Sequence, residues 1–343
     1  MAGPTELISG SPVKYRPLFV SIRVPSVVKI RQRRSHGKIA QLPKVLRNQV
    51  NTLLDKTGRK WHVGAVELSK LEKLRELFRS YGSCLVAYSG GVDSVFLAHV
   101  AHEVLREKSL AVIADSPSLP RRELTEAIAI AEQFHIPLRV VRTQEFNNPA
   151  YLANPNNRCY FCKHELFTEL APLARAEGFA VIAYGENASD VGDHRPGAQA
   201  AAEFEVRAPL KEAGLTKAEI RELSAQFGLP TAEKPQMACL SSRVPYGEAV
   251  STEKLTMIEQ AEYVLRDLGF HDVRVRHHEL SKSAMPLARI EVGPSELAKL
   301  LNDDAASRVG AALKAIGYAH VTLDLQGYRR GSLNENVEGS VKK

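Results

Sequence analysis

The sequence predicts an α/β protein built on a doubly wound parallel sheet, followed by a smaller C-terminal α+β domain. Three observations predict this fold class. Between about residues 67 and 247, short apolar runs of strand length alternate with amphipathic helical patterns. The first strand and the first helix of that series are joined by a glycine-rich turn. Beyond Gly247 the alternation gives way to a different order of helices and strands.

Each predicted strand of the parallel sheet is a short apolar run. The four runs are Leu85–Tyr88, Leu110–Ala114, Leu138–Val141 and Ala180–Tyr184. Strands that alternate with single helices form right-handed crossovers, and ligands then bind at the carboxyl ends of the strands. We therefore expect the functional site at the end of the first strand, where the glycine-rich turn lies.

The helices between these strands are predicted from apolar positions three and four residues apart. Pro120 opens one of them, because its fixed φ suits a helix start. Thr216 and Glu219 form a capping box for another. A long polar loop is expected before Thr216. The predicted helices are the one that follows the glycine turn, then Pro120–Phe134, Cys159–Glu177 and Thr216–Phe227.

The C-terminal α+β domain is predicted from a helix, two strands, further helices and a last strand. These are Ser251–Leu268, Val273–Arg276, Ala288–Val292, one or two helices between Ser295 and Ile316, and a strand near His320–Leu325. The predicted organisation is thus a basic extension over residues 1–66, a nucleotide domain over 67–247, the α+β domain over 248–330 and a tail over 331–343.

The charge of the chain is concentrated at its N-terminal end. Of the net +7, the first 60 residues contribute +11 through 13 Lys or Arg and two acidic residues, so the remainder carries −4. The extension has the composition of an arm that binds nucleic acid or another anionic surface, of an organellar transit peptide, or of a poorly ordered tail. We favour the tail. The mildly acidic body gives no reason to expect a nucleic-acid partner.

Composition describes an ordinary soluble protein of about two domains, with 44% apolar and 25% charged residues in 343. The sequence contains no run of 18 apolar residues, which excludes a membrane-spanning helix. It has four cysteines and no apolar segment typical of a signal peptide. We expect a cytoplasmic protein in which spaced cysteines bind metal or act in catalysis rather than form disulfides.

The turn after the first strand reads Ser89-Gly90-Gly91-Val92-Asp93-Ser94 and is suited to binding pyrophosphate. The two glycines let backbone N–H groups approach an anion, and the helix N-terminus adds partial positive charge. The serine hydroxyls add donors, and Asp93 holds Mg²⁺ or caps the helix. No lysine follows the glycines, so the turn is not a Walker-type loop. The alternative is a plain strand–turn–helix corner.

Cys159 and Cys162 lie one helical turn apart, and Cys239 follows in an irregular stretch. The pair alone suits a redox dithiol, part of a metal site or two small core side chains. Three thiolates are one ligand short of a tetrahedral site, which leaves zinc completed by His164, or a four-iron cluster with one open iron. Cys84, on the first strand, is predicted to pack in the core.

Two further sets of polar residues suit ligand binding. Asn187, Asp190, Asp193 and Arg195 follow the strand that ends at Tyr184, where carboxylates suit Mg²⁺ bound to phosphates. A polar surface loop is the alternative. Arg274 and Arg276 alternate on one strand and share a face, and with Arg243 they suit a phosphate or a carboxylate. A solvated strand face is the alternative.

The segment Ser89–Ser94 resembles the PP-loop of the ATP pyrophosphatase superfamily, whose members cleave ATP to AMP and pyrophosphate while they adenylate a substrate. From about residue 67 to about residue 330 the chain is similar to the LarE family, the sulfur transferases that build the nickel-pincer nucleotide cofactor of lactate racemase. The other matching segments are Ala114–Pro120, Asn187–Gly197, Ala208–Thr216 and Met237–Gly247.

The resemblance implies an ATP-dependent sulfur transferase that uses Mg²⁺ and forms a homo-oligomer. It would adenylate the two carboxylates of pyridinium-3,5-biscarboxylic acid mononucleotide and convert each to a thiocarboxylate. Asp115 and Asn187 would join the loop in binding ATP, and Asp190 and Asp193 would hold Mg²⁺. The residues implied to bind the substrate phosphate are Ser242, Arg243, Arg274 and Arg276, with Glu262 on the preceding helix.

The sulfur source differs between two types within the LarE family. One type gives up the sulfur of a single cysteine, which becomes dehydroalanine; the other holds a four-iron cluster on three cysteines and delivers sulfide from the open iron. Cys159, Cys162 and Cys239 resemble the cluster type, so we expect all three to be catalytic, with a sulfide donor as partner. The chain departs from the family pattern at His194, where Tyr is frequent, and at Gly293, where an acidic residue is usual.

Three other functions compete with this hypothesis. A PP-loop tRNA thiolase also combines the loop with cysteines, but it needs an RNA surface that only the N-terminal extension offers. An amidotransferase-type ATP pyrophosphatase leaves the three cysteines unexplained. A nucleotide- or RNA-binding module without turnover would use the loop only to hold AMP.

Overall fold

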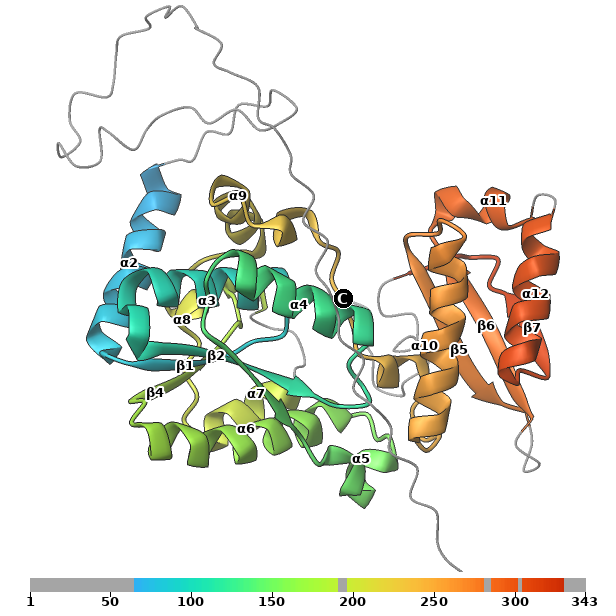
Figure 1. Ribbon diagram of the computed structural model, residues 1–343, viewed down its shortest axis with the longest axis horizontal. Helices are drawn as coiled ribbons and strands as arrows, with labels where there is room; N and C mark the ends of the chain where they lie inside the picture. Colours follow the sequence, from blue (N-terminus) through green and yellow to red (C-terminus); the bar gives the residue numbers. More distant parts are fainter. Residues whose placement is uncertain (1–64, 191–195, 281–284, 302–303, 330–343) are drawn as a thin grey trace, which may run out of the picture. The chain divides into compact units, whose positions relative to one another are not determined.

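The computed structural model describes residues 65–190, 196–280, 285–301 and 304–329, which form two separate β-sheets (Figure 1). A four-stranded parallel sheet belongs to an α/β domain, and a three-stranded sheet to a smaller C-terminal domain, so the predicted fold class is confirmed. The predicted tail and all but the last two residues of the predicted extension lie outside the described residues. The exact domain boundaries stay a prediction.

All strands of the first sheet are parallel, in the order β3-β2-β1-β4. Their bounds are Cys84–Ala87 for β1, Ser109–Asp115 for β2, Leu138–Arg142 for β3 and Val181–Tyr184 for β4. From β1 the chain first builds outward through β2 and β3 and then returns to place β4 on the other side of β1. The order therefore reverses at β1, and the carboxyl ends of β1 and β4 form the crevice in which such sheets bind ligands.

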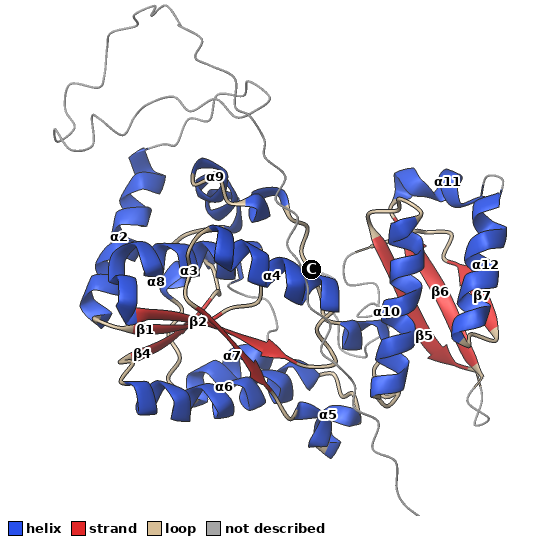
Figure 2. Ribbon diagram, viewed as in Figure 1, coloured by secondary structure: helices blue, strands red, loops and turns tan. Residues whose placement is uncertain are grey.

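Helices cover both faces of this sheet (Figure 2). On one face, α2, α3, α4 and α9 pack against the side chains of Val86 and Ile113; on the other, α6 and α7 pack against Leu85 and Val112. Because successive side chains of a strand point to opposite faces, one apolar run supplies both cores. The bounds are Ala65–Tyr81 for α2, Val92–Leu105 for α3, Arg121–Gln133 for α4, Arg158–Glu177 for α6, Pro196–Glu203 for α7 and Lys217–Gln226 for α9.

Cys84 is fully buried in the first of these cores, as predicted. The capping box of α9 is also confirmed, because the Thr216 hydroxyl accepts from the backbone N–H of Glu219 while the Glu219 carboxylate accepts from the backbone N–H of Thr216. Pro120 lies at the N-cap of α4 rather than inside it, so that helix begins one residue later than predicted.

The prediction of a long loop before Thr216 is wrong in part, because this segment contains two helices. One is α7, and the other is α8, Pro209–Glu212. Alanines dominate α7, which packs on α6 through small side chains and shows too little apolar periodicity to be predicted. The other short helices are α5, Pro149–Leu152, and the 3₁₀ turns η2, Arg106–Lys108, η3, Glu145–Asn147, η4, Ala188–Asp190, η5, Pro230–Glu233, and η6, Leu240–Arg243.

The C-terminal domain is a three-stranded sheet in the order β5-β6-β7, antiparallel between β5 and β6 and parallel between β6 and β7. One face packs its apolar side chains, such as Val275 and Ile290, against α10 and α12. The opposite face carries Arg274, Arg276 and Glu291. The elements are α10, Thr252–Asp267, β5, Val273–Glu279, β6, Pro286–Val292, η7, Pro294–Glu296, α11, Leu297–Leu301, α12, Asp304–Ile316, and β7, His320–Leu323.

A bilayer-spanning helix would have to be both long and apolar, and none of the helices in the described ranges meets both conditions.

Truncation of Leu85 to alanine tests the two-faced core of the parallel sheet. Leu85 is fully buried on β1, so Leu85→Ala is expected to lower the free energy of unfolding by about 2–5 kcal/mol in urea denaturation, through lost burial and the cavity left behind. Val140→Ala, on edge strand β3 with 44% of the residue exposed, is the control and should cost about 1 kcal/mol or less. Equal losses would contradict this description of the core.

Candidate functional site

The glycine-rich loop Ser89–Ser94 runs from the end of β1 into the first turn of α3, at the crevice of the parallel sheet. Gly90 has φ +71°, and a Cβ there would lie 2.6 Å from the Cβ of Ala127 on α4, so only glycine fits. Gly91 is the N-cap of α3 and provides no side-chain hydrogen bond to the first turn. The N–H groups of that turn are therefore left for an anion.

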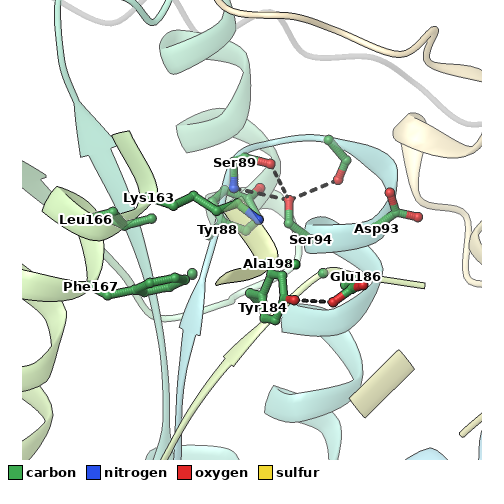
Figure 3. Close-up of a pocket in the computed structure, with 13 residues that line it drawn as sticks. Tyr88, Ser89, Asp93, Ser94, Lys163, Leu166, Phe167, Tyr184, Glu186 and Ala198 are labelled. Carbon is green, nitrogen blue, oxygen red and sulfur yellow. Dashed lines mark hydrogen bonds between the residues drawn. The ribbon is translucent and has the colours of Figure 1, made fainter. Parts of the chain in front are cut away.

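Hydrogen bonds between Ser89, Ser94 and Gly91 brace the loop (Figure 3). The Ser94 hydroxyl donates to the Gly91 carbonyl at 3.1 Å and accepts from the backbone N–H of Ser89 at 3.1 Å. The two hydroxyls lie 3.0 Å apart. The serines that were predicted as anion donors thus also fix the shape of the loop.

A cavity of about 200 Å³ opens beside the loop, between β1, β4 and α6. Figure 3 shows the Lys163 side chain reaching from α6 toward the loop, and its Nζ lies 4.4 Å from the centre of the Tyr184 ring. Glu186 accepts hydrogen bonds from the Tyr184 hydroxyl and from Lys211 Nζ, the latter at 3.0 Å. Burial favours a higher pKa for Glu186, but these two donors outweigh it and lower the pKa.

Asp93, in the first turn of α3, faces the residues that follow β4. Its Oδ2 lies 2.5 Å from Lys217 Nζ, and its Oδ1 accepts from Asn187 Nδ2 at 3.4 Å. Burial raises the pKa of Asp93, and the negative charge of Asp190 raises it further, while Lys217 and Asn187 act against both.

These contacts test the predicted Mg²⁺ site. Asp93 and Asp190 lie close enough to interact electrostatically, and both supply the hard oxygen ligands that Mg²⁺ prefers. The donor set therefore fits Mg²⁺ beside the phosphate loop. Asp193 and Arg195 lie outside the described residues. Asp115, at the end of β2, pairs with Arg121 of α4.

The structure brings Cys239 into the neighbourhood of the other two predicted cysteines, because Arg158, next to Cys159, donates to the carbonyl of Ser241, two residues after Cys239. Cys159 and Cys162 lie on the first turns of α6, and Cys239 is the N-cap of η6. Loss of surrounding water raises the pKa of the Cys162 thiol and of the Cys159 thiol, although the Cys159 residue as a whole is exposed, and a charge on Cys239 raises both further. The donor set suits a cluster with one iron that lacks a cysteine ligand. As placed, however, no three His, Cys, Asp or Glu side chains of the described chain form a metal-binding group.

Arg158 provides a buried positive charge beside these sulfurs. It is 3% exposed, and its Nη1 donates to the Ser241 carbonyl at 2.9 Å and to Asn154. Burial favours a lower pKa for Arg158, but the Cys239 and Cys159 sulfurs outweigh it and raise the pKa. No carboxylate pairs with Arg158 in the ranges that the structure describes. A thiolate or another anion at the cysteines would therefore complete its charge balance.

Arg243 and Glu262 form a fully buried ion pair in which Nε and Nη2 of the arginine donate to the two carboxylate oxygens at 2.8 and 3.1 Å. The Arg243 Nη1 donates to the carbonyls of Ala238 and Cys239, at 2.5 and 2.9 Å. Every terminal nitrogen of Arg243 is thus engaged within the protein. Its predicted role toward a substrate phosphate stays a prediction, while its observed contacts fix the backbone around Cys239.

Arg274 and Arg276 lie on the same face of β5 but differ in their contacts. Arg276 donates to Glu291 Oε2 at 2.7 Å and to the Ser242 carbonyl at 2.9 Å. Arg274 donates to the Val273 carbonyl at 2.6 Å and lies over the Tyr328 ring. In the described part of the chain it makes no hydrogen bond or close ion pair with a carboxylate, although Glu262, which pairs with Arg243, attracts it electrostatically. Burial and the neighbouring Arg243 lower the pKa of Arg274. Arg274 is therefore a buried cation that an anion would stabilise.

Comparisons with known proteins agree with this geometry. The family model described as NAD synthase matches residues 71–156, which include the loop. The chain is 32% identical over 255 residues to the pyridinium-3,5-bisthiocarboxylic acid mononucleotide synthase of Lactiplantibacillus plantarum, covering 74% of this chain and 89% of that protein. The chain belongs to the LarE family. Membership makes it an ATP-using enzyme with a PP-loop domain.

Two other relatives extend the comparison. The chain is 46% identical over 266 residues to the uncharacterized protein slr1717 of Synechocystis sp., covering 78% of this chain and 97% of that protein. It is 26% identical over 234 residues to the glutamine-hydrolyzing GMP synthase of Rippkaea orientalis, covering 57% of this chain and only 41% of that protein. The LarE-family relationship thus extends over most of the chain, whereas the GMP synthase match covers less than half of that enzyme.

Sequence reasoning missed three cations of this LarE-family site. Lys163 follows Cys162 directly, Arg158 precedes Cys159, and Lys217 follows the capping residue Thr216. For Lys163 and Arg158 a signal was present, since basic residues beside a Cys-x2-Cys pair suit thiolates. For Lys217 the sequence gave none, because its partner Asp93 lies 124 positions earlier in the chain.

Substitution of Gly90 tests the constraint on the loop. Gly90→Ala combines a left-handed backbone with a Cβ 2.6 Å from Ala127, so we expect a loss of about 1–3 kcal/mol in stability and weaker ATP binding, by thermal unfolding and calorimetry. Gly91→Ala is the matched control, since its φ is −83° and its Cβ would make only an ordinary contact. Unchanged stability in Gly90→Ala would contradict this loop geometry.

Removal of the charge of Glu262 tests the buried pair. Glu262→Gln leaves the Arg243 guanidinium buried without a counter-charge and should cost about 3 kcal/mol in urea denaturation at pH 7. Burial favours a higher pKa for Glu262, but Arg243 outweighs it and lowers the pKa, so the pair's contribution is present at neutral pH. This contribution to stability is lost as pH falls through the depressed pKa of Glu262. The difference in free energy of unfolding between the wild type and the variant should therefore narrow below about pH 4.

The control for Glu262→Gln is Glu253→Gln, on the exposed first turn of the same helix. We expect Glu253→Gln to change the free energy of unfolding much less than Glu262→Gln does. A pH-independent difference for Glu262→Gln would show that the charge of the pair does not account for the loss.

Proposed function

We propose that this chain is the ATP-dependent sulfur transferase that converts pyridinium-3,5-biscarboxylic acid mononucleotide to its bisthiocarboxylate, a step in building the nickel-pincer nucleotide. The observation that carries the proposal is the position of η6. Its N-cap residue Cys239 lies beside the other two cysteines, and its last residues, Ser242 and Arg243, contact the arginine face of β5 and α10.

The first half of the reaction is activation of a carboxylate. A carboxylate oxygen of the substrate attacks the α-phosphorus of ATP, and pyrophosphate leaves to give an acyl adenylate. The loop N–H groups of α3 bind the pyrophosphate, and Lys163, which lines the same cavity, offsets negative charge on the phosphates. Asp93, with Asp190 and Asn187, would hold Mg²⁺, which supplies charge neutralisation to the polyphosphate.

The second half is displacement by sulfur. A sulfur nucleophile attacks the acyl carbon and the carbon–oxygen bond to AMP breaks, so that AMP leaves and a thiocarboxylate remains. Arg274 is buried and forms no close ion pair with a carboxylate of the described chain, which supports a role in holding the substrate phosphate, together with Arg276 and Ser242. Arg243 and Glu262 support the site by fixing the backbone around Cys239, and direct contact of either residue with the phosphate stays a prediction.

For the sulfur source we propose the three cysteines as ligands of a [4Fe–4S] cluster. The buried Arg158 supports this proposal, because an anionic cluster on Cys159, Cys162 and Cys239 would balance its charge. When bound, such a cluster supplies an open iron that carries sulfide from an external donor. The chain's own contribution is to hold the thiolates and to direct Arg158 toward them.

Cysteine substitutions test this function. In Cys159→Ala, Cys162→Ala and Cys239→Ala, we expect formation of the thiocarboxylate to fall by at least about 100-fold, while substrate-dependent pyrophosphate release persists. Product mass spectrometry and a pyrophosphate assay measure the two steps. Cys84→Ala is the control and should retain sulfur transfer, because Cys84 is a core residue.

Iron and protein mass after turnover distinguish the sulfur sources. The cluster hypothesis predicts about four irons per chain after anaerobic purification and intact cysteines after turnover. Conversion of Cys239 to dehydroalanine would overturn it in favour of a sacrificed cysteine. If pyrophosphate is released at the same rate with and without the pyridinium mononucleotide, the proposed function itself is wrong.

A further inference from the structure

Asn154 lies in the short turn between α5 and α6, four positions before Arg158. It is fully buried, and its φ of +53° falls in the left-handed region, which asparagine tolerates better than most residues do. A buried polar residue on such a backbone persists only where the surrounding contacts fix it. The hydrogen bonds of Asn154 therefore identify the part of the fold that depends on it.

The amide group of Asn154 holds the segment that follows η6. Its Nδ2 donates to the carbonyls of Pro245 at 2.7 Å, Glu248 at 3.0 Å and Val244 at 3.3 Å. Because an amide NH₂ group has two hydrogens, one of them is shared between two of these carbonyls. The backbone carbonyl of Asn154 also accepts from the N–H of Gly247 at 3.0 Å. One residue thus holds this segment through both its side chain and its backbone.

The oxygen of the same amide fixes Arg158. Asn154 Oδ1 accepts from Arg158 Nη1, and that nitrogen also donates to the Ser241 carbonyl at 2.9 Å. Arg158 stands directly before Cys159 at the start of α6, and Ser241 lies two residues after Cys239. Asn154 therefore connects the helix that carries the cysteine pair to the segment that carries Cys239.

These contacts need both ends of an amide. Backbone carbonyls only accept hydrogen bonds, so they require the NH₂ group, whereas a guanidinium group only donates, so it requires the oxygen. Aspartate would keep the acceptor for Arg158 but would offer the carbonyls no donor. Glycine would keep the left-handed backbone but would offer neither group.

We propose that Asn154 is a positioning residue of the sulfur site, which sets the place of Cys239 relative to Cys159 and Cys162. It acts through Arg158 and through the backbone after η6, and not by contact with a reacting group. This inference rests on the proposed function only in that the three cysteines act together as thiolates.

Asn154→Gly tests the arrangement of the cysteines with Cd²⁺, a soft cation that binds thiolates. In the reduced, iron-free full chain of the wild type, the ultraviolet thiolate-to-cadmium absorption band should have the intensity of three thiolates, since Cys84 is buried in the core. In Asn154→Gly it should fall to that of the two-thiolate variant Cys239→Ser. Cd²⁺ should also bind at least about tenfold more weakly, because the residues that orient the ligands are lost.

The two steps of the reaction provide a second measurement on Asn154→Gly. Formation of the thiocarboxylate should fall at least about tenfold, while substrate-dependent pyrophosphate release persists, because the glycine-rich loop does not contact Asn154. A general loss of structure would lower both rates together.

The matched control is Asn148→Gly. Asn148 is the N-cap of α5, and its Oδ1 accepts from the backbone N–H of Ala150 at 2.9 Å, so its side chain acts within that helix. This variant should leave the cadmium band and sulfur transfer unchanged. Should Asn154→Gly fail to fold, as judged by thermal unfolding, Asn154→Asp replaces it, with the same expected loss of band intensity.

A three-thiolate band with unchanged Cd²⁺ affinity in Asn154→Gly would overturn the proposal. A two-thiolate band in the wild type would also overturn it, because Cys239 would then not be held near the pair. Equal losses of pyrophosphate release and sulfur transfer would do the same. If the band falls as expected but the wild type forms no thiocarboxylate, the positioning role stands and the proposed function fails.

Discussion

The buried ion pair between Arg243 and Glu262 is the interaction on which the rest of the site depends. One guanidinium group joins the carboxylate on α10 to the backbone carbonyls of Ala238 and Cys239. Glu262 in turn accepts from the backbone N–H of Val275 on β5. A charge pair so fully removed from water is stable only with good geometry and satisfied donors, and these contacts supply both. The position of the Cys239 backbone is therefore tied to the sheet that carries Arg274 and Arg276.

Two buried arginines that form no close ion pair with a carboxylate of the described chain indicate where this site can bind anions. Arg158 faces the cysteines and Arg274 lies on the arginine face, and within the described ranges no carboxylate pairs with either. Arg243, by contrast, is fully paired and belongs to the framework. All three arginines are almost completely buried, but Arg243 stabilises the fold through its ion pair, whereas Arg158 and Arg274 are available to bind an anionic ligand. Such preorganised charge stabilises anions without reorganisation at the moment of reaction.

The fold was largely predictable because it depends on local patterns. Apolar runs and a glycine turn indicated β1, the loop and α3, and the capping box at Thr216 located the start of α9. The alanine-rich α7 was missed, since its small side chains carry little apolar periodicity. The motif residues were identified by family resemblance, and the structure brings Cys239 to the pair on α6. Lys217 was not predicted, because its partner Asp93 is 124 positions away in the sequence and only the folded chain brings the two together. Arg158 was missed although it stands directly before Cys159.

Transfer of ¹⁸O from substrate to AMP tests the central claim of carboxylate activation followed by sulfur displacement. When the pyridinium mononucleotide is labelled with ¹⁸O in its carboxylates, the oxygen that attacks the α-phosphorus stays with AMP after sulfur replaces it at carbon. The account predicts one ¹⁸O in each AMP released with thiocarboxylate, and none in pyrophosphate. Unlabelled AMP, or formation of ADP and phosphate, would contradict it.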